Sequence, residues 1–134
     1  MGPRVSGFLT PLDLREVGDG SRFIVMEPLV YAAKDDAMYI VPPGTETDFA
    51  SVPRILWNVL PPFGKHSRAA VLHDWLYQTA PHRMSRSAAD DLFRQAMDVC
   101  GVGWFTRQTM WSGVRAGGWG IWKRYRQADE PLGV

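Results

Sequence analysis

The stretch Arg68-Ala-Ala-Val-Leu-His-Asp-Trp-Leu-Tyr-Gln78 decides how this chain is organised. We expect it to form a mostly apolar, buried helix. One face of that helix would carry Ala69, Leu72, His73, Leu76 and Tyr77. A histidine and a carboxylate are costly to bury unless they are hydrogen-bonded, paired or bound to a metal. Asp74 lies about 100° round the helix from His73, so one side chain can handle a proton while the other holds a cation.

The bulk composition fits a single domain that spans residues 1–134. The net charge of +1 does not favour a general attraction to nucleic acid or anionic lipid, so a nucleic-acid partner is not expected. The single cysteine, Cys100, allows no intrachain disulfide. The first residues lack the apolar run of a signal peptide, and no apolar run is long enough for a transmembrane segment.

Residues 1–54 are expected to be mainly β structure. Short apolar runs alternate there with turn-forming residues such as Gly18-Asp-Gly-Ser21 and Lys34-Asp-Asp36. The runs are Phe8–Val17, Phe23–Met26, Leu29–Tyr31 and Met38–Val41. Their length and spacing predict a small antiparallel meander.

Residues 55–128 are expected to be mainly helical, with a tail at 129–134. Ser67 is predicted to cap the central helix and Ser85 a second one that ends near Cys100. A third helix is expected at 105–116, and Gly117-Gly118 separates it from a short fourth one at 119–126. The predicted fold class is therefore α+β, with a β meander packed on three to four helices.

Asp90 stands at the edge of the apolar face of the second helix. One interpretation is that it supports the N-terminus of that helix, through the helix dipole or a capping box with Ser87. The other is that it faces the central helix and orients His73. The residues alone favour neither.

Three units can carry chemistry: Asp48, His73-Asp74-x-x-Tyr77, and Asp90-Asp91. An imidazole whose second nitrogen is bonded to a carboxylate is a general base that can activate water near neutral pH. A neighbouring carboxylate with loop carbonyls suits a hard cation such as Ca²⁺, which would polarise a carbonyl or phosphoryl oxygen. Asp48 or Arg54 would form an additional part of the site, or Asp48 would only make a turn.

A transition-metal site is the alternative to calcium. His66, His73 and Asp74 could contribute to it, as in metal-dependent phosphohydrolases, although those need further histidines on separate helices. This alternative predicts a metal-dependent cell-wall or nucleic-acid hydrolase. No Cys-x-x-Cys or His-Glu-x-x-His motif is present, which argues against structural zinc and zincin sites.

Five basic residues and no acidic ones lie between Asp98 and Asp129, interleaved with aromatic residues. Such a segment suits a membrane interface or a nucleic-acid patch. The more common arrangement places the aromatic residues in the core and the charges on the solvated face.

Most of the chain resembles a family of small uncharacterised proteins of tailed phages and prophages. The residues that carry this resemblance are Val41–Arg54, which contains Thr-Asp-Phe-Ala-Ser-Val-Pro-Arg, then Pro61–Gly64, His73–Tyr77 and Ala89–Met97. The resemblance implies a phage origin. A phage protein would be synthesised in the host cytoplasm, and it could be incorporated in the virion with other phage structural proteins as partners.

The segment 61–97 also resembles the phospholipase A2 superfamily, above all its parvoviral and prokaryotic members. The motif is His73-Asp74-x-x-Tyr77 followed by Ala89-Asp90-x-x-Phe93. The resemblance implies that His73 is the base, Asp90 the acid that orients it, and Tyr77 a hydrogen-bond donor to this pair. It also implies that Asp74 binds Ca²⁺ together with carbonyls of the loop that contains Phe63 and Gly64. The disulfides of the secreted enzymes are absent, and Asp48 has no counterpart there.

We therefore expect a phage-encoded hydrolase-like protein with a cation-assisted site of phospholipase A2 type. Its substrate would be an ester, in a lipid or another cell-envelope component. Ca²⁺ is the expected cofactor, or another divalent metal in its place. The alternative is a non-enzymatic virion, tail or assembly protein in which the His-Asp-Tyr network only holds the core together.

Overall fold

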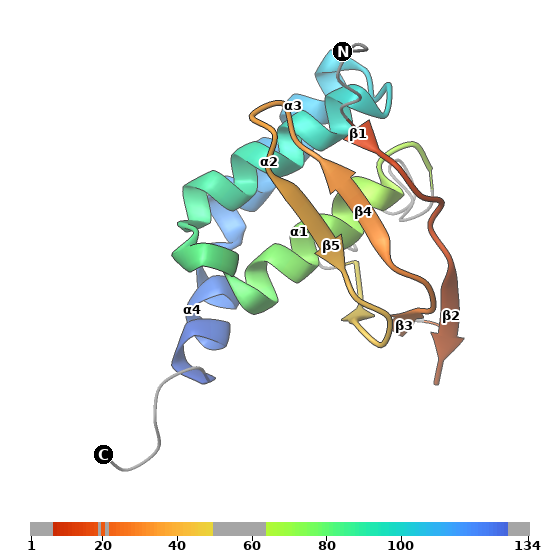
Figure 1. The fold of residues 1–134 in the computed structure, drawn as a ribbon. Coiled ribbons are helices and arrows are strands. Elements are labelled where there is room, and N and C mark those ends of the chain that lie inside the picture. The colour runs from red at the N-terminus through yellow and green to blue at the C-terminus, as the bar shows by residue number, and fades with distance from the viewer. Residues whose placement is uncertain (1–6, 19, 21, 50–63, 129–134) are drawn as a thin grey trace.

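The chain has an α+β fold, as predicted. The computed structural model describes residues 7–18, 20, 22–49 and 64–128. Six strands occupy the N-terminal half and four α-helices the C-terminal half (Figure 1). The tail at 129–134 and two expected site residues, Arg54 and Phe63, lie outside the described residues.

The strands form two antiparallel sheets of three strands each, so the expected meander is divided. The first sheet has the order β1-β4-β5 and the second the order β2-β3-β6. Pro28, just before β4, has no backbone N–H for a ladder, which helps to explain why β3 and β4 separate. The strand bounds are β1 Gly7–Phe8, β2 Leu14–Val17, β3 Arg22–Val25, β4 Leu29–Ala32, β5 Met38–Val41 and β6 Glu46–Thr47.

The helices begin and end close to the positions that the sequence predicts. Their bounds are α1 Ser67–Thr79, α2 Arg86–Val99, α3 Trp104–Gly117 and α4 Trp119–Ala128, with a 3₁₀ turn at Pro81–Arg83. Ser85 caps α2, because its side chain accepts a hydrogen bond from the Ala88 N–H. Ser67 does not cap α1: it is the first helical residue, and its Oγ accepts from the Gly64 N–H.

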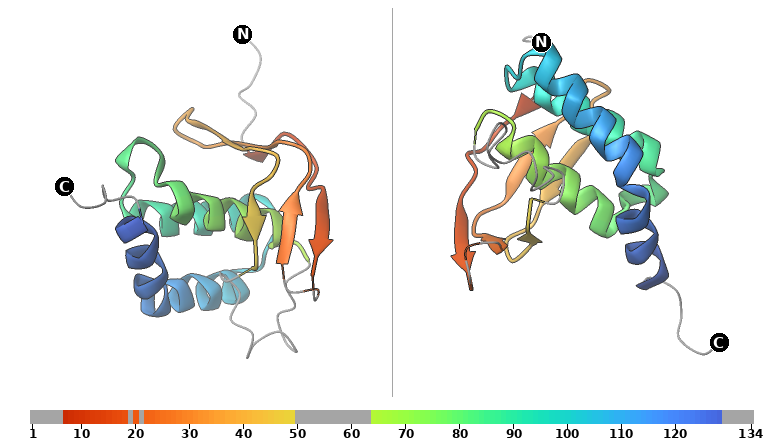
Figure 2. Two further views of the ribbon diagram at one scale, coloured as in Figure 1. Left: turned by 90° about the horizontal axis from the view of Figure 1, so that it is seen from below. Right: turned by 180° about the vertical axis from the view of Figure 1, so that it is seen from behind.

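Helix α1 lies at the centre of the molecule. Figure 2 shows the β1-β4-β5 sheet on one side of α1 and α2, and α3 and α4 on the other. The buried face predicted for α1 is confirmed, and it packs against buried side chains of β4 and α2 such as Tyr31 and Phe93. Because neighbours surround α1 on several sides, its polar residues His73 and Asp74 are buried as well.

The basic and aromatic C-terminal segment is divided between the interior and the surface. Arg107, Arg115 and Arg126 donate hydrogen bonds within the molecule. Trp122 packs against the core, whereas Trp104, Phe105 and Trp119 are exposed. In the part of the chain that the structure describes, no helix has both the length and the apolar character to cross a bilayer.

Candidate functional site

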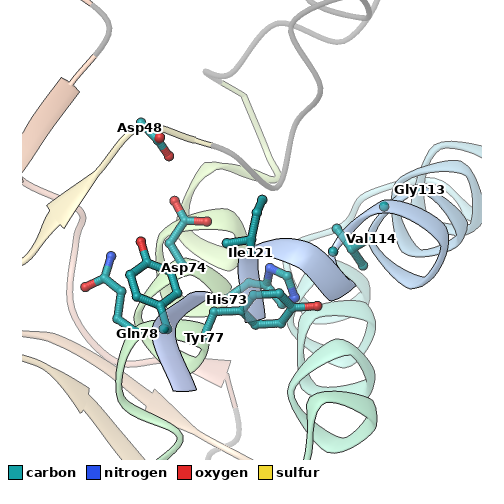
Figure 3. A pocket seen from close by; sticks show the side chains of 11 residues that line it. Asp48, His73, Asp74, Tyr77, Gln78, Gly113, Val114 and Ile121 are labelled. Atoms are coloured by element: carbon teal, nitrogen blue, oxygen red, sulfur yellow. The ribbon is translucent and has the colours of Figure 1, made fainter. Parts of the chain in front are cut away.

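A cavity of about 150 Å³ opens between α1, α3, α4 and the end of β6 (Figure 3). Helix α1 contributes its polar residues, and α3 and α4 contribute mainly apolar or small ones. The lining residues are Asp48, His73, Asp74, Tyr77, Gln78, Gly113, Val114, Gly117, Gly118, Ile121 and Tyr125. Four residues of the expected site, Asp48, His73, Asp74 and Tyr77, therefore meet at one cavity.

The imidazole of His73 is bonded to the carboxylate of Asp90 on the neighbouring helix. The distance from His73 Nε2 to Asp90 Oδ1 is 2.7 Å. The His73 side chain is only 2% exposed, and its ring stacks on Phe93 with 4.5 Å between the ring centroids. Stacking and hydrogen bond together fix the plane of the ring, so a single imidazole orientation faces the cavity.

Asp90 collects further donors from three helices. Tyr77 Oη on α1 donates to Oδ1 over 2.7 Å, and Arg115 Nη1 on α3 donates to Oδ2 over 2.8 Å. Arg86 Nη1, one turn before Asp90 on α2, lies 3.4 Å from Oδ2 and also donates to the Val114 carbonyl. Two guanidinium groups thus compensate a carboxylate that is completely buried. Asp90 orients His73, and Ser85 rather than Ser87 caps the helix.

The environment keeps Asp90 ionised and Tyr77 protonated. Burial by itself would raise the pKa of Asp90, but the hydrogen bonds from His73 and Tyr77, with help from Arg115, bring it below the ordinary value. Burial and the hydrogen bond to Asp90 raise the pKa of Tyr77 far above the ordinary value. The pair therefore consists of a carboxylate that accepts and a hydroxyl that donates.

Asp74 lines the same cavity but is turned toward β6 instead of Asp90. Its Oδ2 accepts a hydrogen bond from Thr47 Oγ1 of β6, and Thr47 Oγ1 in turn accepts from the Phe49 N–H. Figure 3 shows the side chains of Asp48 and Asp74 extending toward one another at the cavity. Burial, followed by the negative charges of Asp74 and Asp48, raises the pKa of Tyr125, so all three groups lie at the same rim.

The expected calcium ligands are only partly gathered. Among the described residues, no group of three or more His, Cys, Asp or Glu side chains is placed to hold a metal ion. Gly64 lines a separate depression at the start of α1 with Lys65 and Arg68, and not the cavity of Asp74. Ca²⁺ takes six to eight oxygen ligands. Of these ligands, the described cavity offers the carboxylates of Asp48 and Asp74 and the side-chain oxygen of Gln78.

Of the two histidines expected in the alternative metal site, His73 lines the cavity and His66 does not, and the third histidine, His82, also lies apart from it. His66 is buried at the N-cap position of α1, and His82 is exposed in the 3₁₀ turn after α1. Among the residues that the structure describes, neither belongs to the cavity lining. The described part of the site thus contains one histidine, His73.

Sequence reasoning missed three partners of the site: Thr47, Arg86 and Arg115. Thr47 directly precedes Asp48, and no pattern in the sequence links it to Asp74. A signal existed for Arg86, because it lies four residues before Asp90 on the same helix. Arg115 was counted with the basic residues of a solvated face, although an aspartate buried on an apolar face requires a cation from elsewhere.

A protein-family model described as "Protein of unknown function (DUF1353)" matches residues 23–114. The match includes both sheets from β3 onward, the His73–Asp90 pair and most of α3, and it ends before α4. No curated protein and no solved structure matches the chain.

Proposed function

The chain belongs to this family of proteins of unknown function, and we propose that it is a hydrolase in which His73 is the general base. The observation that carries the proposal is the 2.7 Å bond between His73 Nε2 and Asp90 Oδ1, with His73 also lining a cavity. A buried imidazole that is oriented by a carboxylate and faces a cavity is suited to take a proton from water.

The proposed reaction is water attack on an ester. Because Nε2–H donates to Asp90, Nδ1 carries the lone pair that accepts the proton of the water molecule. The water oxygen bonds to the carbonyl carbon, the bond from that carbon to the alcohol oxygen breaks, and the proton on His73 passes to the leaving alkoxide. The products are a carboxylic acid and an alcohol. Base catalysis of this kind contributes about 10²- to 10⁴-fold in rate.

Asp90 and its cations act by positioning. Asp90 stays ionised throughout and stabilises the imidazolium that forms on His73. Arg86 and Arg115 hold the carboxylate in place from α2 and α3. Tyr77 helps to hold Oδ1 of Asp90 in place, because Tyr77 and His73 both donate a hydrogen bond to this oxygen.

Asp74 and Asp48 would hold a divalent cation, with Ca²⁺ as the first choice because both offer oxygen ligands. When bound, such a cation supplies electrostatic stabilisation of the negative charge that develops on the ester oxygen. With this cation the site would be of phospholipase A2 type, and a phospholipid ester would be its substrate.

A non-enzymatic role in a phage virion or tail is the second candidate. The observation in its favour is that Asp90 joins α1, α2 and α3 through four side-chain donors, as a structural network would. In that role the same residues serve stability alone, and the cavity needs no substrate.

One experiment separates the two candidates. Hydrolysis of mixed phospholipid–detergent micelles is measured over a Ca²⁺ titration for the wild type, His73→Gln and Asp74→Asn, with Ca²⁺ binding followed by calorimetry. His82→Gln is the matched control, because His82 is exposed and outside the cavity lining. The proposal expects turnover in the wild type and the control and its loss in His73→Gln. A folded wild type without turnover, or His73→Gln with full turnover, overturns it.

A further inference from the structure

We propose that the cavity is a subsite for a compact apolar group of the substrate and that Gly113 and Gly117 of α3 set the size it accepts. This inference rests on the proposed hydrolase, and it names the kind of ester that His73 would receive. The group would be roughly the size of a benzene ring, because a cavity of 150 Å³ can hold benzene.

The two walls of the cavity differ in their chemistry, and this difference supports an apolar subsite next to the polar groups. Residues of α1 and the end of β6 supply the polar wall with His73, Asp74 and Asp48, whereas α3 and α4 supply Val114 and Ile121 opposite. An apolar group gains free energy by leaving water for the second wall, and its carbonyl then lies toward the first. Gly113 lies beside Val114 on α3, as Figure 3 shows, and Gly117 follows one turn later on the same helix.

No close contact with the described residues requires glycine at either position, although Gly117 also ends α3. Among the residues that the structure describes, a Cβ atom built at Gly113 or Gly117 meets no atom within 4 Å. Within a helix, glycine is less stable than alanine by about 0.8–1 kcal/mol. Gly118 differs, because a Cβ there would stand 2.6 Å from the Tyr77 hydroxyl oxygen. The missing side chains at Gly113 and Gly117 therefore also leave the mouth of the cavity open.

The polar part of the substrate has a place beside the cavity. A second depression shares Asp48, Gln78 and Tyr125 with the cavity and continues along Arg22 and Glu46. An ester bound across this junction would have its apolar acyl group inside and its polar alcohol part in the outer depression. The substrate class is thus a short or compact acyl ester of a polar alcohol, and a phospholipid would bind here only with an acyl group of that size.

The test fills the mouth of the cavity with Gly113→Leu and Gly117→Leu. Gly120→Leu is the matched control: Gly120 is also exposed, its Cβ also meets no described atom within 4 Å, and it is not among the described residues that line the cavity. The unfolding curve of each leucine variant shows whether it folds. A leucine variant that does not fold is replaced by the alanine variant at the same position, Gly113→Ala or Gly117→Ala.

The first readout does not depend on hydrolysis. Each protein is treated with diethyl pyrocarbonate, and mass spectrometry gives the modification rate of His73 relative to exposed His82. We expect a several-fold lower relative rate in the two mouth variants and no change in Gly120→Leu. Benzyl alcohol should protect His73 in the wild type. The subsite proposal is overturned if His73 is modified at the same relative rate in all proteins. It is also overturned if Gly120→Leu lowers that rate as much as the two mouth variants do.

The second readout is the hydrolysis of p-nitrophenyl acetate, butyrate and hexanoate. We expect the mouth variants to lose the longer acyl chains first and the control to keep the wild-type order. If the wild type hydrolyses none of these esters while the leucines still shield His73, the hydrolase proposal fails and the apolar subsite stands. If esters are hydrolysed equally by every variant, the subsite fails and the hydrolase stands.

Discussion

His73 and Asp90 are 17 residues apart in the sequence, yet their side chains join α1 to α2 through one 2.7 Å hydrogen bond inside the protein. The carboxylate is completely buried and the imidazole almost so. A polar pair at this depth requires partners for its remaining atoms. Tyr77, Arg86 and Arg115 provide them, so the pair and its surroundings respond as a unit to substitution and to pH.

Replacement of Asp90 by asparagine should destabilise the protein strongly. It leaves the guanidinium groups of Arg86 and Arg115 without their buried counter-charge. We expect the free energy of unfolding to fall by about 3 kcal/mol. This loss is at the lower end of what a broken buried ion pair costs, because Arg115 is partly exposed. Urea denaturation of the two proteins measures it.

The control for that experiment is Asp91→Asn on the same helix. Asp91 is 57% exposed and its nearest cation, Arg94, is also on the surface. Its replacement should leave the free energy of unfolding nearly unchanged. Similar losses for both variants would mean that the charge of α2 as a whole matters, and not the contacts of Asp90.

The stability of the wild type should fall in acid because of Asp90. The pKa of this carboxyl is lower in the folded protein than its ordinary value of 3.8. The unfolded chain therefore takes up the proton first, so the contribution of Asp90 is present above about pH 4 and is lost as the pH falls through the folded pKa. Urea unfolding from pH 7 to pH 3 should show a steeper acid loss in the wild type than in Asp90→Asn. Parallel curves would contradict this origin.

Gly118→Ala should weaken the network without removing any of its polar groups. The new Cβ would stand 2.6 Å from both the Tyr77 hydroxyl oxygen and the Val114 carbonyl oxygen, so Tyr77 must move away from Asp90. We expect a loss of about 1–3 kcal/mol in the free energy of unfolding, as for other overpacked sites. Gly113→Ala, whose Cβ meets nothing, should instead raise it by up to about 1 kcal/mol. Two effects of the same sign would count against the steric explanation.

Arg126→Met should loosen α4 from α1. The Arg126 Nη2 atom donates to the carbonyls of Tyr77 and Gln78, two acceptors at the C-terminal end of α1, over 2.8 and 2.9 Å. Loss of these charge-assisted bonds should cost about 2 kcal/mol. Amide hydrogen exchange should also become faster in α4 than in α2. Arg124→Met, at an exposed position of the same helix, is the comparison, and an equal change there would refute the role of Arg126.

The helical half could be predicted well because its signals are local. Ser85, Gly101 and the Gly117-Gly118 pair mark helix ends through capping and glycine, which act within a few residues. The burial of His73 followed from the apolar face of α1. Its contact with Asp90 stood as one of two interpretations, since α2 alone does not say what faces it.

The division of the strands could not be predicted because it depends on distant pairs. β1 pairs with β4, and β3 pairs with β6. No residue pattern in the segments between these strands indicates either pairing. β1 and β6 have only two residues each, too few for an alternation of apolar and polar side chains. The bond from Thr47 to Asp74 depends on the β3–β6 pairing and was missed for the same reason.

The contact between Asp90 and Arg115 also bears on how the chain acquires its site during synthesis. Asp90 leaves the ribosome 25 residues before Arg115, so at first only Arg86 accompanies the carboxylate. Docking α2 on α1 at that stage would bury a negative charge that lacks its closest cation, at 2.8 Å. The nascent chain therefore has an energetic reason to leave the helices undocked until α3 is available. The protein would then acquire the oriented imidazole of His73 late, and in one cooperative step.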